Sequence, residues 1–243
     1  MNLIKLSAID STNSYLKILA KETRVDDRTV VIAEKQISGR GQMGNGWVSK
    51  EGESLTFSIF KEFDELFADN QFIISMAVSL GILEGFKPLN IPKISIKWPN
   101  DILSANKKIG GILIENVLEG SRVKHSIIGI GINVNETVFT NLPQASSLKL
   151  QTGIDFNLDE VFQIILKSVF NYLNNLSEID FSEMKQLYQK HLFKGNKISV
   201  FENPNGFRYN GIIRGVSDMG ELLIETENTA IKKFQLKEVK LIY

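Results

Sequence analysis

Apolar residues recur at helical spacing in four stretches of the chain, and each stretch is long enough for an amphipathic helix. These stretches are residues 15–20, 72–83, 161–173 and 184–192. Just before the first stretch, a run of Asp, Ser, Thr and Asn at 10–13 supplies side chains that commonly start helices. We therefore predict four helices, the first of about three turns.

Short runs rich in β-branched and aromatic residues separate these helices and predict strands. The predicted strands lie around Ile4 and Leu6 and at 29–33, 54–60, 94–98, 102–106, 108–117 and 126–134. The runs at 102–106 and 108–117 are close enough together to form a hairpin. Helices and strands mixed in this order predict a layered α+β domain.

The pattern changes near residue 195, where the helical spacing ends. From there to residue 243 the chain consists of short β-rich runs broken by turn signals such as Asn205-Gly206 and Met219-Gly220. This pattern predicts a small all-β barrel of about five strands. We therefore predict two domains, at 1–194 and 195–243.

Composition narrows the classes of function. The 243 residues are 43% hydrophobic and 23% charged, which is typical of a globular protein, and 28 basic residues balance 28 acidic ones. A net charge of zero argues against a nucleic-acid or membrane partner that is bound through general electrostatics. The chain has no cysteine, no signal peptide and no apolar run of about 20 residues, so a cytoplasmic protein is expected.

Conventional catalytic and metal-binding patterns are missing. Neither His125 nor His191 stands in a metal-ligand pattern, no Ser-His-Asp arrangement is visible, and the lack of cysteine excludes thiolate-bound zinc. We therefore predict no metal site made by the protein alone.

A glycine-rich loop at 39–44 matches the G-x-G-x-x-G pattern of dinucleotide-binding turns. The context argues against that function, because the few residues between Gly44 and the strand at Ser54 have no helical period. The loop still offers backbone amides and the cation of Arg40 to a charged ligand. A solvated surface loop is the alternative.

Three further segments combine polar side chains or glycines with strands. The segment 97–101 (KWPND) places polar groups just after a strand, although a simple turn would use the same residues. Two lysines open the strand at 107–115, followed by Gly110 and Gly111. Glycines alternate at 129–133 and leave one strand face bare, which suits either a flat ligand or a closely packed helix.

Together, in this order and spacing, these segments resemble the biotin protein ligase family. The resemblance runs from about residue 5 to 135, and the β-rich end resembles that family's SH3-like C-terminal domain. It implies a mixed-sheet catalytic domain like those of class II synthetases. The implied enzyme joins biotin to AMP and passes it to a lysine of a biotin carrier protein. ATP and Mg²⁺ are the implied cofactors.

The resemblance also implies functions for individual residues. Biotin would be bound by Ser11, Thr12, Asn13, Gln36, Gly39, Arg40, Gly41, Gln42, Lys108, Gly111 and Gly129. The nucleotide would be bound by Trp47, Asn100, Gly131 and Asn133. The catalytic residues would be Arg40, Lys108 and Asp101. Lys108 would bridge the biotin carboxylate and the α-phosphate, and Asp101 would orient the carrier lysine.

The chain departs from the family in two places. Gln42 and Asn45 stand where the family's loop frequently has arginines, so two positive charges near the phosphates are absent. The first motif starts at Ser11, which leaves no room for the DNA-binding domain that some members carry, so no DNA partner is expected. Homodimerisation stays open. The alternatives are a lipoate or octanoyl ligase or transferase and a non-catalytic biotin-binding protein.

Overall fold

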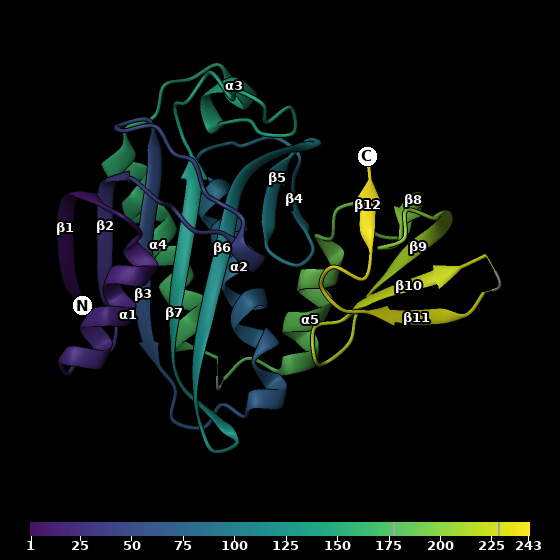
Figure 1. Ribbon diagram of the computed structural model, residues 1–243, viewed down its shortest axis with the longest axis horizontal. Coiled ribbons are helices and arrows are strands. Elements are labelled where there is room, and N and C mark those ends of the chain that lie inside the picture. The colour runs from purple at the N-terminus through teal and green to yellow at the C-terminus, as the bar shows by residue number, and fades with distance from the viewer. Residues whose placement is uncertain (177, 228) are drawn as a thin grey trace.

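The computed structural model describes residues 1–176, 178–227 and 229–243, which form two β-sheets with helices packed around the larger one (Figure 1). The large sheet has the strand order β1-β2-β3-β7-β6-β5-β4. Its strands are β1 (Asn2–Ile9), β2 (Thr29–Gln36), β3 (Ser54–Glu62), β4 (Ile94–Lys97), β5 (Asp101–Ser104), β6 (Lys107–Glu119) and β7 (Arg122–Asn133). β1 and β2 pair in parallel and the other neighbours pair antiparallel, so the sheet is mixed, as predicted.

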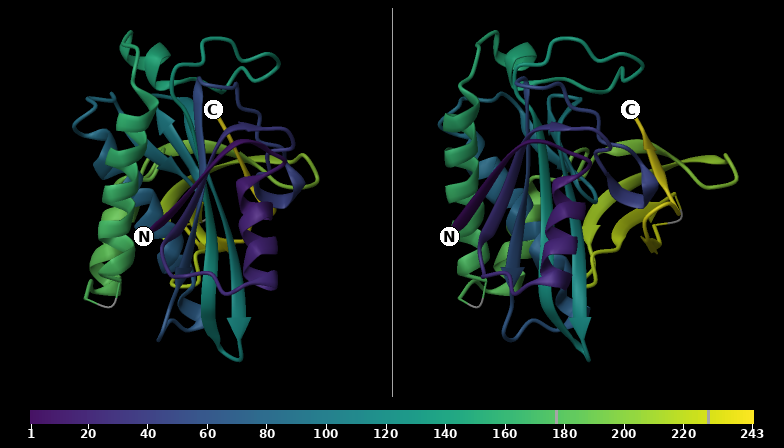
Figure 2. Two further views of the ribbon diagram at one scale, coloured as in Figure 1. Left: turned by 90° about the vertical axis from the view of Figure 1, so that its left-hand side faces the viewer. Right: turned by 60° about the vertical axis from the view of Figure 1, so that its left-hand side comes forward.

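Helices cover both faces of this sheet. On one face α1 (Thr12–Glu22) packs against β2, β3 and β7, whereas α2 (Phe72–Phe86) and α4 (Leu158–Asn174) pack together on the other. Figure 2 shows α1 and α4 on opposite sides of the sheet. α5 (Phe181–Lys190) contacts α2 and leads into the second sheet.

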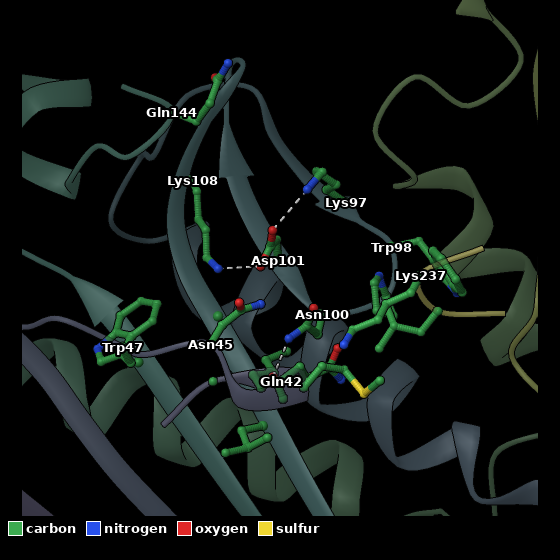
Figure 3. A pocket seen from close by; sticks show the side chains of 18 of the residues that line it. Gln42, Asn45, Trp47, Lys97, Trp98, Asn100, Asp101, Lys108, Gln144 and Lys237 are labelled. Atoms are coloured by element: carbon green, nitrogen blue, oxygen red, sulfur yellow. Dashed lines mark hydrogen bonds and ion pairs between the residues drawn. The ribbon is translucent and has the colours of Figure 1, made fainter. Parts of the chain in front are cut away.

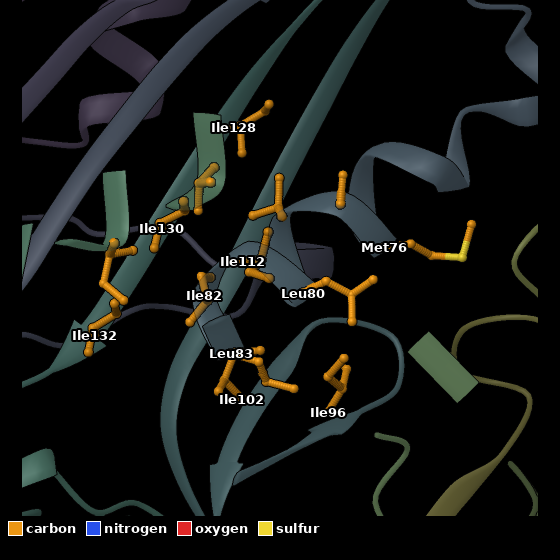
Figure 4. Close-up of a cluster of buried hydrophobic side chains, with 14 of the residues drawn as sticks. Met76, Leu80, Ile82, Leu83, Ile96, Ile102, Ile112, Ile128, Ile130 and Ile132 are labelled. Carbon is orange, nitrogen blue, oxygen red and sulfur yellow. The ribbon is translucent and has the colours of Figure 1, made fainter. Parts of the chain in front are cut away.

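The main core lies between α2 and the strands. The sequence predicted one apolar face for this helix, but Ile74, Val78 and Ile82 are buried as well as Met76 and Leu80. The reason is that α4 and α5 both pack against α2, in addition to the strands. Figure 4 shows this cluster, in which isoleucines of β4, β5, β6 and β7 meet α2.

The second sheet has the strand order β11-β10-β9-β8-β12 and is antiparallel. Its strands are β8 (Ile198–Glu202), β9 (Arg208–Val216), β10 (Leu222–Thr226), β11 (Ile231–Phe234) and β12 (Lys240–Ile242). The predicted number of strands is confirmed, but the predicted closed barrel is wrong, since the edge strands β11 and β12 do not pair with each other in the described residues. The three-residue β12 pairs with β8 alone among the strands.

The two sheets share one hydrophobic core. Phe201, Ile213 and Leu222 of the second sheet belong to the same buried cluster as the residues of α2. The boundary at residues 194 and 195 stays a prediction, although the chain passes from α5 into β8 there. In the described part of the chain, no helix is both long and apolar enough to cross a membrane.

Short elements were harder to predict than long ones. The hairpin of β5 and β6 is confirmed. The described structure also has no helix between Gly44 and β3, as the argument against a dinucleotide-binding turn required. The sequence analysis missed the helix α3 (Leu148–Thr152) and the 3-10 turns η1 (Gln42–Gly44) and η2 (Ala68–Asn70). These elements have three to five residues, too few to establish a helical period.

The contact between α2 and α4 depends on glycine. A Cβ at Gly81 would lie 2.7 Å from the Cα of Val169, a backbone atom that cannot move aside. We expect Gly81→Ala to lower the free energy of unfolding by about 1–3 kcal/mol, despite its better helix propensity. Gly85→Ala is the matched control, because its nearest neighbour is the movable side-chain tip of Ile165. Urea unfolding of both variants would contradict this account if Gly81→Ala were the more stable.

Candidate active site

One large pocket, of about 1050 Å³, lies where the large sheet meets the second sheet. Its walls include the start of α1, the loop that contains η1, the segment 97–101, and glycines of β6 and β7. The second sheet contributes residues of β8 and the chain from Leu236 to Tyr243. Figure 3 shows part of this pocket from close by. Segments that are far apart in the sequence thus line a single cavity.

Buried hydroxyl and amide groups form the polar end of the pocket. The backbone N–H of Thr12 donates to Gln36 Oε1 at 2.8 Å, and the Thr12 hydroxyl lies 3.2 Å from the same oxygen. The hydroxyl of Ser58, on β3, lies 2.7 Å from that of Thr12 and 2.6 Å from Asn13 Oδ1. Ser11 caps α1 by accepting the N–H of Ser14. The helix start therefore presents a preorganised set of hydrogen-bonding groups.

Glu115 on β6 connects this end to the glycine-rich loop. Lys17 Nζ lies 2.9 Å and Arg40 Nη2 3.4 Å from Glu115 Oε1, while Asn13 Nδ2 donates to Oε2. Burial raises the pKa of the Glu115 carboxyl, but the hydrogen bonds from Lys17 and Asn13 and the charge of Arg40 outweigh burial and lower it. The carboxylate therefore stays ionised and holds Arg40 at the pocket wall.

The glycines of β6 and β7 are covered by side chains of this chain itself. The indole of Trp47 lies on Gly111 and Gly131, and a Cβ at Gly111 would be 3.1 Å from its Cζ3 atom. The side chain of Asn13 occupies the space above Gly129. The bare strand face predicted from the sequence thus receives a flat indole and the start of a helix.

Two buried polar atoms of the glycine-rich loop have no hydrogen-bond partner in the described structure. They are the indole Nε1 of Trp47 and the amide oxygen Oε1 of Gln42, and both residues line the pocket. The loop closes on itself, because Trp47 N donates to Gly39 O at 2.8 Å and Gly41 N donates to Asn45 O at 2.7 Å. A donor and an acceptor therefore stand ready for a ligand.

A carboxylate flanked by two lysines lies at the centre of the pocket. Lys108 Nζ is 2.6 Å from Asp101 Oδ1, and Lys97 Nζ is 3.2 Å from Asp101 Oδ2 (Figure 3). β4 and β5 place Lys97 opposite Asp101, whereas Lys108 comes from β6. Lys108 Nζ also lies 5.6 Å from the ring centroid of Trp47. Burial and then the charge of Asp101 raise the pKa of the nearby Tyr243 phenol.

Most of the residues predicted for the site line this pocket. They are Ser11, Thr12, Asn13, Gln36, Arg40, Gly41, Gln42, Trp47, Asn100, Asp101, Lys108, Gly111, Gly129 and Gly131. Gly39 and Asn133 do not line it. A Cβ at Gly39 would collide with the Trp47 carbonyl oxygen, and Asn133 Nδ2 donates to Ser146 O at 2.9 Å. Both residues support the walls rather than face the cavity.

Sequence reasoning missed several residues of the site. Ser58 is fully buried and contacts Thr12, but the sequence did not single it out, because β3 also carries the hydroxyls of Ser54 and Thr56. Glu115 ends the segment 107–115 described above, but no neighbouring residue in the sequence indicated its contact with Arg40. The contribution of the second sheet, including Lys237 and Tyr243, had no sequence signal.

Comparison with known proteins agrees with this geometry. The model of the biotin/lipoate A/B protein ligase family matches residues 6–133. The bifunctional ligase/repressor BirA of Bacillus spizizenii is 32% identical, over 99% of this chain and 74% of that protein. The biotin–[acetyl-CoA-carboxylase] ligase of Paracoccus denitrificans is 24% identical, over 90% of this chain and 92% of that protein.

Solved structures agree as well. The biotin protein ligase from Aquifex aeolicus, in complex with biotin and ATP, superposes with a TM-score of 0.80 and 30% identity. The match covers 99% of this chain and 98% of that one.

The chain therefore belongs to the biotin/lipoate A/B protein ligase family. Within that family it groups with the biotin protein ligases, a family of ATP-dependent ligases, which confirms the resemblance seen in the sequence.

The contact of Trp47 with the glycines can be tested directly. A Cβ at Gly131 would overlap the indole, so we expect Gly131→Ala to drive Trp47 into solvent and to shift tryptophan emission to the red. The overlap should cost about 1–2 kcal/mol of unfolding free energy, because the loop can relax. Gly46→Ala is the control, since its Cβ would meet nothing closer than 3.8 Å. An equal shift in a Trp47→Phe background would contradict the assignment to Trp47.

Proposed function

We propose that this protein activates biotin as biotinyl-AMP and transfers the biotinyl group to a lysine of a biotin carrier protein. The observation that carries the proposal is the shared pocket. It holds a polar end, the cations Arg40, Lys97 and Lys108, and an indole on a glycine surface within one cavity. These are the groups that a carboxylate, a nucleotide phosphate and a nucleotide base require.

The polar end is suited to the ring system of biotin. A urea group has both donors and an acceptor, and Ser11, Thr12 and Gln36 offer matching hydroxyl and amide groups. Ser58 contacts the Thr12 hydroxyl and is itself held by Asn13 Oδ1. Because these groups are largely buried, a ligand that lacks the urea would leave them unpaired, which disfavours lipoate.

In the first step the biotin carboxylate oxygen attacks the α-phosphorus of ATP. An oxygen–phosphorus bond forms, the bond to the bridging oxygen of the leaving group breaks, and pyrophosphate leaves with the electron pair. Arg40 and Lys108 would reduce the repulsion between the two anions and stabilise the charge that builds on phosphorus. To do so, Lys108 would leave Asp101 and contact the substrates. Arg40 would likewise leave Glu115 and contact the substrates.

Mg²⁺ would enter with the nucleotide. The described residues contain no group of three or more His, Cys, Asp or Glu side chains that could hold a metal ion by themselves. Asp101, which lies between two lysines, is the one carboxylate of the first domain that lines the pocket. When bound, the ion would supply charge neutralisation at the phosphates, and the phosphates would supply most of its ligands.

In the second step the amine of the carrier lysine attacks the carbonyl carbon of the mixed anhydride. A carbon–nitrogen bond forms, the bond to the phosphate oxygen breaks, and AMP leaves. The attacking amine must lose a proton, and Asp101 can orient it and accept that proton. Asp101 becomes available for this task once Lys108 has turned to the phosphate.

The same pocket suggests how the nucleotide base is bound. Trp47 would stack on adenine, and its unpaired Nε1 donor gives it a further hydrogen bond to offer. The side chain of Asn100 donates from Nδ2 to Ile112 O at 2.7 Å. We therefore propose that Asn100 supports the wall of the pocket. We propose no DNA or membrane partner for this neutral chain, and a cytoplasmic location and a homodimer stay proposals.

Replacing Lys108 tests the proposed reaction. We expect Lys108→Ala to lower the rate of biotin-dependent exchange of pyrophosphate into ATP by about 100-fold or more, since one charge at the reacting phosphate is lost. Lys107→Ala is a matched control, because the neighbouring Lys107 does not line the pocket and instead donates to Pro143 O. Equal rates for Lys108→Ala and the unchanged protein would contradict the assignment.

The alternatives are separated by what is transferred. With ATP and magnesium, the unchanged protein should attach biotin, and neither lipoate nor octanoate, to the lysine of a biotin carrier domain. Transfer of lipoate or octanoate in place of biotin would assign the lipoate reaction. Biotin binding without pyrophosphate exchange would leave the non-catalytic alternative.

A further inference from the structure

The second domain places a lysine in the wall of the pocket. Lys237 lies in the turn between β11 and β12, is exposed, and lines the cavity together with the residues of the first domain. In the view of Figure 3 it lies on the same side as Trp98 and Asn100, and Trp47 lies on the other side. None of the ion pairs formed by the described residues includes Lys237.

The other cations of the pocket are engaged. Lys97 and Lys108 are paired with Asp101, and Arg40 is paired with Glu115. In the second domain, Arg208 lies 2.8 Å from Glu202. Lys240 lies opposite Glu202 in the pairing of β12 with β8. The hydrogen bond from Arg208 and then the charges of Arg208 and Lys240 lower the pKa of the Glu202 carboxyl. Lys237 is therefore a pocket cation to which the described residues offer no carboxylate.

The backbone at Lys237 is unusual. Its φ is +74°, a value that favours glycine, and it belongs to the turn at 235–238. The turn is held by a hydrogen bond from Gln235 N to Glu238 Oε2 at 2.7 Å. Replacement of Lys237 by glycine would therefore relieve the backbone at this position.

The turn is also fixed relative to the reacting groups. Trp98 Nε1 donates to Gly220 O at 2.8 Å, which ties the second domain to the segment that carries Asn100 and Asp101. On either side of the turn, Phe234 and Val239 pack against the shared core. The residues that flank the Lys237 turn are therefore anchored in the core that the two sheets share.

We propose that Lys237 binds the β- and γ-phosphates of ATP and the pyrophosphate that leaves in the first step. This inference rests on the proposed function, and it assigns the leaving-group end of the nucleotide to the second domain. With Arg40 and Lys108 at the carboxylate and the α-phosphate, the remaining phosphates need another cation. Lys237 neutralises the charge that the leaving pyrophosphate gains when its bond to the α-phosphorus breaks, and no proton is transferred.

The proposal is tested with three variants at one position and a control elsewhere in the domain. Lys237→Ala removes the charge, Lys237→Gly removes the charge and relieves the backbone, and Lys237→Arg keeps the charge. Lys232→Ala is the matched control, because Lys232 is exposed on β11 and does not line the pocket. The measurements are the KM for ATP, the KM for biotin, inhibition by inorganic pyrophosphate, and the midpoint of thermal unfolding.

We expect Lys237→Ala and Lys237→Gly to raise the KM for ATP by about tenfold and to weaken pyrophosphate inhibition by a similar factor. The KM for biotin should change less than about twofold, and the effects should shrink as salt is added. Lys237→Arg should remain close to the unchanged protein. Lys237→Gly should unfold at the same temperature as the unchanged protein or higher, which separates loss of charge from loss of fold.

Two results would overturn the inference. One is an unchanged KM for ATP together with unchanged pyrophosphate inhibition in Lys237→Gly, and the other is an equal change in Lys232→Ala. Failure of the proposed function would be distinct, because then the unchanged protein itself would not exchange pyrophosphate into ATP when biotin is present.

Discussion

Close approach of side chains to the backbone of β6 and β7 is the constraint on which the pocket depends. Because Gly111, Gly129 and Gly131 have no Cβ, the indole of Trp47 and the start of α1 can lie directly on the sheet. That approach brings the glycine-rich loop, and Arg40 with it, to the same cavity as Lys108. A larger residue at these glycine positions would move the glycine-rich loop, and Arg40 with it, away from Lys108.

Local patterns predicted the hairpin of β5 and β6 but left a simple turn as the alternative for the segment 97–101. The functions of Asp101 and Lys108 were predicted only from the family resemblance, which rests on the order and spacing of the segments. Asn133 looked equally functional in the sequence, yet its amide supports the backbone at Ser146. A polar side chain near a pocket can serve the ligand or the wall, and only tertiary contacts decide between them.

The parts that could not be predicted depend on where separate segments meet. The extensive burial of α2 comes from α4 and α5, which lie much later in the chain. The second sheet is open because its edge strands β11 and β12 do not pair with each other in the described residues. Because the two sheets share one hydrophobic core, the second domain is packed firmly against the first and forms part of the pocket wall. No local pattern indicates which turn of the second domain contacts the first domain, so Lys237 was not predicted as a residue of the site.

The ion pairs of Asp101 have a consequence for selectivity among anions. Lys97 and Lys108 both pair with Asp101, which lies between them at 3.2 and 2.6 Å. A small monovalent anion such as chloride would have to replace a closer, hydrogen-bonded carboxylate, so it gains little by entering. A ligand with several charges and many contacts gains enough interaction energy to compensate for the loss of these ion pairs. The two lysines beside Asp101 therefore favour polyvalent anions over the anions of common salts.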